Sequence, residues 1–368
     1  MPEQITPLSV LYLQLHGAGT AVATVLCLYL LLCRCKAIAP DITPPARLRR
    51  WAGALFGVMA LAHVWWILFY TFLDDTSSVI YGLLVAGDCM VLPPVFVGTL
   101  LAMLQDRRRP LWPIFVVITP CSVLAVLQTV LPSVDLTWPN KLYGLALIAA
   151  FIIYMVVAVR QYEQWLRDNY ADLEHKEVWV SLTLLIAFVL LLMSYEYTDN
   201  YVMCTVAHLI GFPLAGLLLW RVETLKDLSA DRFSDETGHS SLLLRGKLGE
   251  ASNIALLLAK HCEEAQLYLN PDLTLSQLSR AVGVNRYYIS QYFASRDTSY
   301  YAYIHDLRVR HFIARFRELA TAHMPISALQ LAQESGFHSY STFSTAFKQR
   351  MHKSVTAWMH EEVLHPQP

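Results

Sequence analysis

The chain has 368 residues, of which 55% are apolar and only 15% are charged, and its mean hydropathy is +0.39. A typical soluble domain carries about 25% charged residues, so much of this chain is expected to lie in lipid. The same composition excludes a disordered protein, a disulfide-stapled secreted module and a single water-soluble enzyme core. The net charge of -1 is uninformative until the positions of the charges are considered.

Apolar runs of membrane-spanning length recur through the first 220 residues, with short polar breaks between them. The shortest break is Asp199 and Asn200, which predicts a tight turn because one joined helix would be too long for a bilayer. The sequence therefore predicts an all-α fold that begins with a seven-helix membrane bundle. The seven runs are residues 8–32, 51–73, 79–104, 111–131, 141–159, 178–198 and 201–220.

Positive charges are sorted to one side of these runs. One alternate set of loops carries eleven Lys and Arg residues, whereas the other carries only Lys141 and includes the acidic pair Asp74 and Asp75. The positive-inside rule then predicts an extracytoplasmic N-terminus and a cytoplasmic C-terminal part. The eleven residues are Arg34, Lys36, Arg47, Arg49, Arg50, Arg107, Arg108, Arg109, Arg160, Arg167 and Lys176.

The sequence becomes polar after residue 222. Acidic residues and a Gly-His-Ser-Ser run without a sustained apolar period indicate a linker, and helical periodicity resumes near residue 249. We therefore predict a membrane domain over 1–222, a linker over 223–248 and a soluble helical domain over 249–368. Within 271–353 ten Lys and Arg residues stand against five Asp and Glu, which indicates a basic surface.

A helix-turn-helix pattern opens this basic stretch. An amphipathic helix over 275–282 is followed by Gly283, which suits a left-handed turn residue, and by Asn285 as a helix cap. A second helix then buries Ile289 and Phe293 one turn apart.

The same pattern returns about fifty residues later. A helix over 326–334, a turn at Gly336 and a second helix that buries Phe343 and Phe347 repeat the unit, and a long helix over 300–319 joins the two. Two linked units favour DNA binding more strongly than one. They allow two recognition helices to enter successive major grooves, about 34 Å apart, on one face of the duplex.

Over about the last 100 residues, the pattern of residues in these units resembles the DNA-binding domain of the AraC family of bacterial transcription regulators. The sequence departs from the family pattern at one point: His352-Lys353-Ser354-Val355 stands where the family usually has Gly, any residue, Ser and Pro. The residues that carry the resemblance are Tyr268, Asn270, Pro271, Leu273, Leu275, Leu278, Gly283, Asn285, Ser290, Phe293, Tyr303, Ile304, Leu307, Arg308, Val309, Ile326, Ala332, Glu334, Ser335, Gly336, Phe337, Ser339, Phe343, Phe347 and Lys348.

Exposed positions near the start of each second helix are expected to contact DNA bases, and basic side chains elsewhere are expected to contact phosphates. Ser339 is expected either to cap its helix or to bind phosphate. The predicted base contacts are Arg286, Tyr287, Ser290, Gln291, Tyr340, Ser341 and Thr345. The predicted phosphate contacts are Arg308, Arg310, Lys348, Arg350 and Lys353, with Ser339.

Ionisable residues inside the predicted spans are costly in lipid and are therefore candidates for function. We predict that they line an outward-facing ligand pocket; a metal site, a pH sensor and a structural polar network are the alternatives. Metal ligation is less favoured, and no metal or cofactor is predicted, because no two of them share the i, i+4 spacing of helical His pairs. These residues are His16, His63, Asp88, Glu196 and His208.

The seven cysteines show no paired metal-binding spacing, so small buried apolar roles are expected for them. Gly53 and Gly57 form a Gly-x-x-x-Gly motif that predicts close helix packing.

Together these features predict a membrane-embedded, non-enzymatic transcription regulator of the bacterial inner membrane. Its expected partners are double-stranded promoter DNA, membrane lipid, a second copy of the chain and an unidentified small-molecule or ion signal, with RNA polymerase as a further candidate. Signalling by dimerisation and by unmasking of the DNA-binding face both remain open. The alternatives are an intramembrane metal-dependent hydrolase using His63, Asp88 and His208, and a transporter-like sensor.

Overall fold

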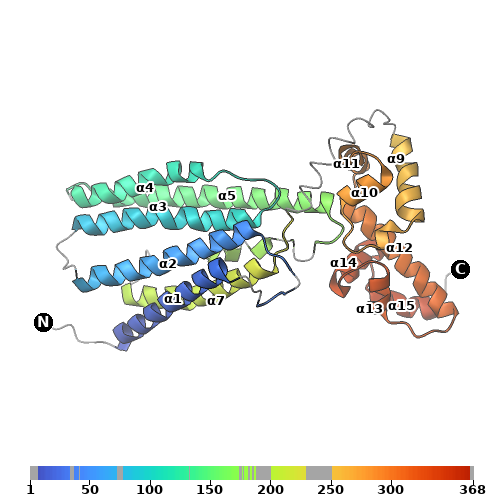
Figure 1. Cartoon of the computed structure of the whole chain (residues 1–368), viewed down its shortest axis with the longest axis horizontal. Helices are drawn as coiled ribbons and strands as arrows, with labels where there is room; N and C mark the ends of the chain where they lie inside the picture. Colours follow the sequence, from blue (N-terminus) through green and yellow to red (C-terminus); the bar gives the residue numbers. More distant parts are fainter. Residues whose placement is uncertain are drawn as a thin grey trace. The chain divides into compact units, whose positions relative to one another are not determined.

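The computed structural model describes residues 7–33, 37–40, 42–72, 78–131, 133–173, 176, 178–180, 183–184, 186–187, 200–228 and 251–364. The chain divides into two compact units, Met1–Tyr162 with His175–Ser229, and Glu163–Glu174 with Ala230–Pro368. Helices make up both units, and among the described residues the one β-type pairing is an isolated bridge between Tyr170 and Thr274 (Figure 1). The predicted all-α fold is confirmed.

The first unit consists of long apolar helices. Among the described residues, five helices are long and apolar enough to cross a membrane: Val10–Leu32, Ala46–Phe69, Val79–Met103, Trp112–Val130 and Thr137–Asn169. They correspond to the first five predicted runs. The helices of this unit are α1 (Pro7–Leu32), α2 (Ala46–Phe72), α3 (Ser78–Met103), α4 (Trp112–Val130), the first part of α5 (Thr137–Asn169) and α7 (Asn200–Thr224).

The last two predicted spans have different outcomes. Helix α7 begins at Asn200, at the predicted break, and covers the seventh run. The sixth run, 178–198, lies largely outside the described residues, and so does Asp199. The count of seven spans therefore stays a prediction.

Small residues allow the helices of the first unit to pack closely. Helix α1 packs against α2 and α7, and α3 packs against α2 and α4. A Cβ atom on Gly53 would lie 2.7 Å from Cδ2 of Leu31, and one on Gly57 would lie 3.2 Å from Sγ of Cys27. The predicted packing role of the Gly53 and Gly57 motif is confirmed, because both glycines of α2 face α1 at distances that larger residues would not fit.

Helix α5 is longer than the sequence prediction. The apolar run 141–159 predicted a span followed by a polar loop, but the helix continues to Asn169 over 33 residues, which is about 50 Å. The hydrocarbon core of a bilayer is about 30 Å thick. The helix continues because Tyr162 and Leu166, one turn apart, are fully buried, and its last residues belong to the second unit.

The first residues of the predicted linker are packed into the first unit. The Glu223 carboxylate is buried and accepts hydrogen bonds from the Tyr29 hydroxyl and, at 2.8 Å, from the Ile38 N–H. The Leu228 N–H donates to Oε1 of Gln105 at 2.9 Å. Residues 223–228 are therefore not a free connection, and residues 229–248 lie outside the described part of the chain.

The second unit contains a small helical domain built around two cores. It begins with α9 (Ala251–Leu258), which continues into a π-helical turn, η1 (Ala259–Glu264), and a short 3-10 turn, η2 (Leu267–Leu269). The remaining helices are α10 (Leu275–Val282), α11 (Arg286–Ala294), α12 (Tyr300–Thr321), α13 (Ala328–Glu334), α14 (Tyr340–Met351) and α15 (Val355–Leu364).

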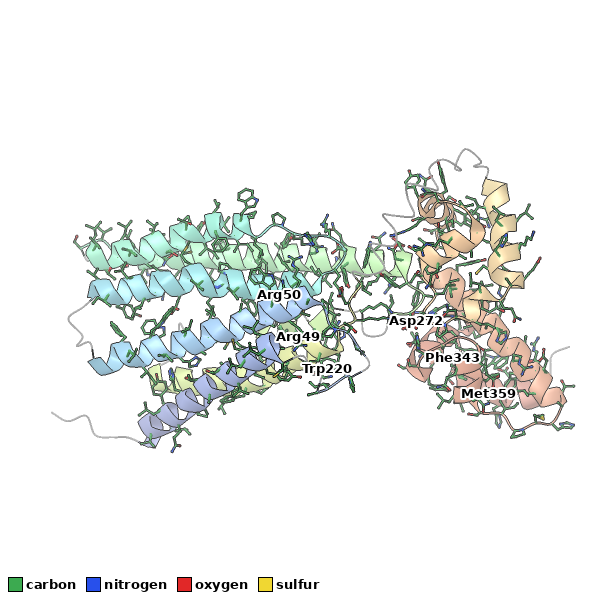
Figure 2. The ribbon with its side chains drawn as sticks, viewed as in Figure 1. Arg49, Arg50, Trp220, Asp272, Phe343 and Met359 are labelled. Atoms are coloured by element: carbon green, nitrogen blue, oxygen red, sulfur yellow. The ribbon has the colours of Figure 1, made fainter. Side chains whose placement is uncertain are left out.

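Helix α12 connects the two cores. Its N-terminal half contributes Tyr300, Ile304 and Leu307 to a core with α9, α10 and α11. Its C-terminal half contributes Phe312 and Phe316, among others, to a core with α13, α14 and α15. Phe343 of α14, labelled in Figure 2, is fully buried in this second core. The long helix predicted over 300–319 is thus the shared element of both predicted units.

Candidate functional site

The first helix-turn-helix consists of α10 and α11. Thr274 caps α10 in a reciprocal capping box with Gln277, in which each side chain accepts from the backbone N–H of the other. Gly283 ends the helix with a φ of 73°, and the Asn285 side chain caps α11 by accepting from the Tyr287 N–H at 2.8 Å. These contacts are local in sequence, and they confirm the predicted turn and cap.

The second helix-turn-helix consists of α13 and α14. Gly336 has a φ of 89°, and a Cβ atom there would lie 2.8 Å from the Leu269 carbonyl oxygen, so only glycine fits this turn. The Ser339 side chain caps α14 by accepting from the Thr342 N–H. Of the two roles expected for Ser339, the capping role is confirmed.

The recognition helices α11 and α14 align when they are numbered from their caps. Ile289 and Phe293 lie four and eight residues after Asn285, as Phe343 and Phe347 do after Ser339, and all four are buried. This alignment pairs Arg286 with Tyr340, Tyr287 with Ser341, Gln291 with Thr345 and Ser290 with Ser344. Sequence reasoning missed Ser344, although the internal repeat contained the signal.

The predicted base contacts lie away from the two cores. Tyr287, Gln291, Tyr340, Ser341 and Thr345 are exposed, while Arg286 and Ser290 are partly buried. The Gln291 amide donates to the Tyr287 hydroxyl at 2.7 Å, which orders one patch on α11. The arrangement suits insertion of each helix into a major groove, and the individual base contacts stay predictions.

Four of the predicted phosphate contacts, Arg310, Lys348, Arg350 and Lys353, are exposed, whereas Ser339 is partly buried. Several of the exposed cations pair with acidic side chains of the same domain. Arg310 lies 3.1 Å from Asp306, to which Arg350 is also ion-paired, and Lys353 lies 2.6 Å from Glu361. Lys348 is exposed on α14. Exposed pairs of this kind are worth at most about 1 kcal/mol, so phosphates can compete for these cations.

Arg308 does not fit its predicted phosphate role. Its side chain is fully buried, and it donates to the backbone carbonyls of Tyr268 and Asn270, each at 2.8 Å. Burial lowers the pKa of Arg308 to about 10, which keeps the guanidinium charged at neutral pH. The prediction was wrong because periodicity placed Arg308 on the outer side of α12, where the loop before α10 in fact covers it.

A short segment from the far end of α5 is built into the second unit. Ala171 is fully buried in the first core of this unit, and its N–H donates to the Leu273 carbonyl at 3.3 Å. The buried ring of His305 contacts the Ala171 carbonyl oxygen at 2.8 Å through Nε2. No pattern in the sequence indicates that residues 169–172 pack with the C-terminal helices.

This segment also contacts the start of both recognition elements. The Asn169 side-chain oxygen accepts a hydrogen bond from Arg286, the first residue of α11. The Asp172 carboxylate lies 4.0 Å from Nε2 of His338, in the turn before α14. A predicted base-reading residue is thus bonded to a part of the chain that follows an apolar helix.

His305 is held in its neutral form within the core. Burial and, as a smaller cause, the nearby Arg308 charge together lower the pKa of His305 to about 3. A neutral imidazole carries a single N–H, so its Nε2 donates that proton to the Ala171 carbonyl.

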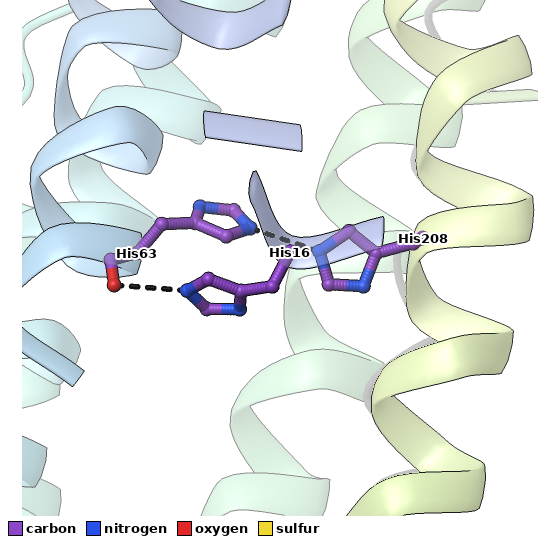
Figure 3. Close-up of side chains that lie close together, drawn as sticks. All are labelled: His16, His63 and His208. Atoms are coloured by element: carbon purple, nitrogen blue, oxygen red, sulfur yellow. Dashed lines mark hydrogen bonds between the residues drawn. The ribbon is translucent and has the colours of Figure 1, made fainter. Parts of the chain in front are cut away.

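Three of the five intramembrane ionisable residues converge in the first unit. His16 of α1, His63 of α2 and His208 of α7 place one ligand nitrogen each within 4.8 Å of one another. Nε2 of His63 lies 3.3 Å from Nε2 of His208, and Nε2 of His16 donates to the His63 carbonyl at 2.9 Å (Figure 3). We refer to these three residues as the histidine cluster.

The two carboxylates predicted to share this pocket are not part of the described cluster. Asp88 instead accepts a 2.7 Å hydrogen bond from the Trp66 indole N–H, so the His63, Asp88 and His208 group expected of a hydrolase is not assembled. Glu196 lies outside the described residues. Five cysteines in the described part of the chain are unpaired. The buried role expected for the cysteines is confirmed for Cys262, which is fully buried, but not for Cys33, which is exposed; Cys27, Cys89 and Cys121 are half-buried.

Comparison with known proteins identifies the second unit. A family model described as a helix-turn-helix domain matches residues 278–361, which span α11 to α14 and parts of α10 and α15. No curated protein and no solved structure matches the chain. The match confirms the resemblance found in the sequence for the C-terminal domain and covers less than a quarter of the chain.

Proposed function

Because the C-terminal domain is an AraC-type helix-turn-helix domain, and hence that of a DNA-binding transcription regulator, we propose that the chain controls promoters from within the bacterial inner membrane. In this proposal the N-terminus is extracytoplasmic, the apolar helices sense a signal, and the cytoplasmic domain binds specific double-stranded DNA as a homodimer. RNA polymerase is the expected target of the bound regulator.

One observation supports this proposal most directly: α5 begins as an apolar span and ends within the DNA-binding unit. The helix is apolar over its first part, and residues 169–172 are built into the core of the second unit. A change in the tilt or rotation of this helix would act on the recognition elements without passing through the linker.

The contact between Asn169 and Arg286 supplies a mechanism for this coupling. An Arg286 amino group that is bonded to Asn169 cannot at the same time complete a bidentate contact with guanine. We propose that signal binding shifts the balance between these two uses of Arg286, with dimerisation as a second contribution through effective concentration.

The proposed function is tested by mapping the sites that the full-length chain occupies on the chromosome, together with membrane fractionation. We expect the protein in the membrane fraction and its binding at a small set of sequence-related promoters. Recovery from the soluble fraction, or binding without sequence preference, would reject the proposal.

The coupling is tested by Asn169→Ala in the full-length chain. Removal of this acceptor is expected to raise promoter occupancy without stimulus several-fold. The ratio of stimulated to unstimulated occupancy should therefore fall. Gln333→Ala, which shortens an exposed amide on α13, is the matched control and should behave as the parent protein. Occupancy that is equal in all three proteins would contradict a restraining role for Asn169.

A further inference from the structure

We propose that the histidine cluster binds one divalent transition-metal ion of the zinc class. We further propose that this ion is a signal read by the membrane domain, a second step that rests on the proposed function. The ligands are one imidazole nitrogen each from His16, His63 and His208, and the fourth position is left to water or to a small anion.

The spacing of the ring nitrogens fits such an ion. Zinc binds imidazole nitrogens at about 2.0 to 2.1 Å in tetrahedral geometry, so two ligand nitrogens on one ion lie about 3.3 Å apart. The Nε2 atoms of His63 and His208 are separated by 3.3 Å. One ring nitrogen of His16 lies within 4.8 Å of a ring nitrogen of each of the other two histidines.

Backbone carbonyls fix two of the rings as metal ligands. Nδ1 of His63 lies 2.6 Å from the Met59 carbonyl oxygen, which can only accept, so the ring proton sits on Nδ1 and Nε2 keeps its lone pair. By the same argument Nε2 of His16 carries the proton given to the His63 carbonyl, and Nδ1 keeps the lone pair. Metal-binding histidines commonly donate their second ring N–H in this way.

A glycine makes room for the third ring. A Cβ atom on Gly19 would lie 2.9 Å from Cδ2 and 3.1 Å from Nε2 of His208, and 3.5 Å from Nε2 of His63. The absence of a side chain one turn after His16 therefore permits the approach of α7 that brings its imidazole into the group. In the described part of the chain, no atom outside the backbone of α1 and the neighbouring residues lies within 4 Å of a Cβ atom built on Gly17, two residues earlier on the same helix.

The cluster also has a position suited to an ion that arrives from one side. His16 and His208 lie nine and eight residues from the starts of α1 and α7, and His63 lies nine residues from the end of α2. All three are therefore about 12 to 14 Å from the helix ends that the predicted topology places on the extracytoplasmic face. An ion shared by three helices would draw them together, whereas its loss would let them separate.

Metal binding is tested on the purified full-length chain in lipid nanodiscs, carrying an affinity tag without histidine. After chelation and reloading with zinc, elemental analysis is expected to give about one zinc per chain. His63→Ala and His208→Ala should lose it, and the exposed His360→Ala should retain it. A parent protein that holds no zinc, or zinc that survives both substitutions, would overturn the proposal in favour of a hydrogen-bonded structural cluster.

Two further variants keep the test valid if the alanine variants fold poorly. His208→Cys should retain the ion and add a thiolate-to-metal charge-transfer band on loading with Co²⁺, a gain that misfolding does not produce. Gly19→Ala should weaken zinc binding at least tenfold, because its methyl group displaces the His208 ring, while Gly17→Ala should leave the affinity unchanged. A His208→Cys protein that takes up Co²⁺ without the new band, or equal affinity in the two alanine variants, would remove His208 from the site.

The signalling step has its own readout. Zinc depletion and zinc addition should change occupancy of the mapped promoters in cells with the parent chain and not in cells with His63→Ala. Stoichiometric zinc with unchanged occupancy would overturn the signalling step and leave the metal site standing. A chain that binds zinc but no specific promoter would reject the proposed function instead, so the two failures are distinguishable.

Discussion

Arg308 and Arg310 lie two residues apart on α12, yet they have opposite environments. Arg308 is buried and bonded to the carbonyls of Tyr268 and Asn270, whereas Arg310 is exposed and pairs with Asp306. Removal of Arg308 leaves two buried carbonyl oxygens without their donor, at about 1 to 3 kcal/mol each.

We therefore expect Arg308→Ala to lower the free energy of unfolding of the DNA-binding unit by about 3 kcal/mol, and Arg310→Ala to change it by less than about 0.5 kcal/mol. Thermal melting of the full-length chain measures the difference. If the two variants melted together while both bound DNA weakly, Arg308 would be a phosphate contact after all.

Substitutions of Gln291 and Lys348 distinguish sequence-specific base recognition from sequence-independent phosphate binding. Gln291 is exposed on α11, and Gln291→Ala is expected to change the preferred base at one position, where the parent gains about 1 to 3 kcal/mol of discrimination. Lys348→Ala should weaken all DNA sequences alike and reduce the slope of log affinity against log salt by about one. Selection from randomised DNA measures both; an unchanged base preference for Gln291→Ala would exclude it from readout.

The residues whose roles could be predicted from the sequence are those that make their contacts with residues nearby in the chain. Gly283, Asn285 and Ser339 act through backbone groups within four residues, so their turn and cap positions could be predicted from sequence. Arg308 could not, because its partners are about forty residues earlier in the chain. The histidine cluster could be predicted in part. The sequence identifies the intramembrane histidines as candidates, but their convergence depends on how α1, α2 and α7 pack.

At the scale of helices, the C-terminal end of α14 lies at the point where the sequence departs from the family pattern. His352, which occupies the usual glycine position of the family pattern, adopts a left-handed φ of 55°. A non-glycine residue pays a conformational cost there, and glycine does not.

His352→Gly is therefore expected to stabilise the domain by up to about 1 kcal/mol, whereas Lys353→Gly, whose φ is not positive, should be neutral or destabilising. Both side chains are exposed, but Lys353 also pairs with Glu361, so Lys353→Gly removes up to about 1 kcal/mol of ion pairing in addition to its backbone effect. A lower melting temperature for His352→Gly would mean that its imidazole makes a stabilising contact that outweighs the φ cost.

The docking of residues 169–172 on α12 depends on pH through His305. In the folded state the pKa of His305 is lowered to about 3 from 6.5, so between these values the unfolded chain binds a proton that the folded chain does not. Stability is therefore present above pH 6.5 and falls as the pH drops toward 3, with a slope of at most about 1.4 kcal/mol per pH unit.

Melting of the parent chain and of His305→Gln between pH 7 and pH 4 checks this expectation. The variant should start less stable and lose less on acidification, because its amide does not titrate. The exposed His360→Gln is the control and should follow the parent. Parallel pH curves for parent and His305→Gln would show that His305 is not the group responsible.

Helix bounds in the second unit followed closely from periodicity and caps, whereas α5 did not. Helices α10 and α11 begin within a residue of their predicted starts. Asn285 was predicted as the cap of α11, whereas the capping role of Thr274 at α10 is found only in the structure. The extension of α5 carries Arg160, Glu163 and Arg167, and these charged residues predict a polar loop. Tyr162 and Leu166, which are one turn apart on the same helix, are buried. The loop prediction was wrong because it rested on the charged residues, whereas the burial of Tyr162 and Leu166 keeps this segment helical.

For the whole molecule, the number of spans decides whether the regulator can reach DNA. An extracytoplasmic N-terminus requires an odd number of crossings to place α9 to α15 in the cytoplasm. Five helices meet the length and apolarity of a span, and α7 follows them with Arg221 near its C-terminal end. The predicted topology therefore requires the run 178–198 to cross as well, because with α7 alone there would be six crossings and the DNA-binding domain would lie outside.

Reporter fusions in the full-length chain test this topology. A periplasm-active phosphatase inserted after residue 75 or residue 199 should be active, and a cytoplasm-active fluorescent protein inserted after residue 107 or residue 235 should fluoresce. An insertion within 169–172 is avoided because Ala171 is part of the core of the DNA-binding unit. Phosphatase activity after residue 235 would place that unit outside and contradict both the seven-span topology and the proposed function. Fluorescence there with an inactive phosphatase after residue 199 would instead mean five crossings, with 178–198 and α7 on the cytoplasmic side and the histidine cluster assembled differently in the membrane.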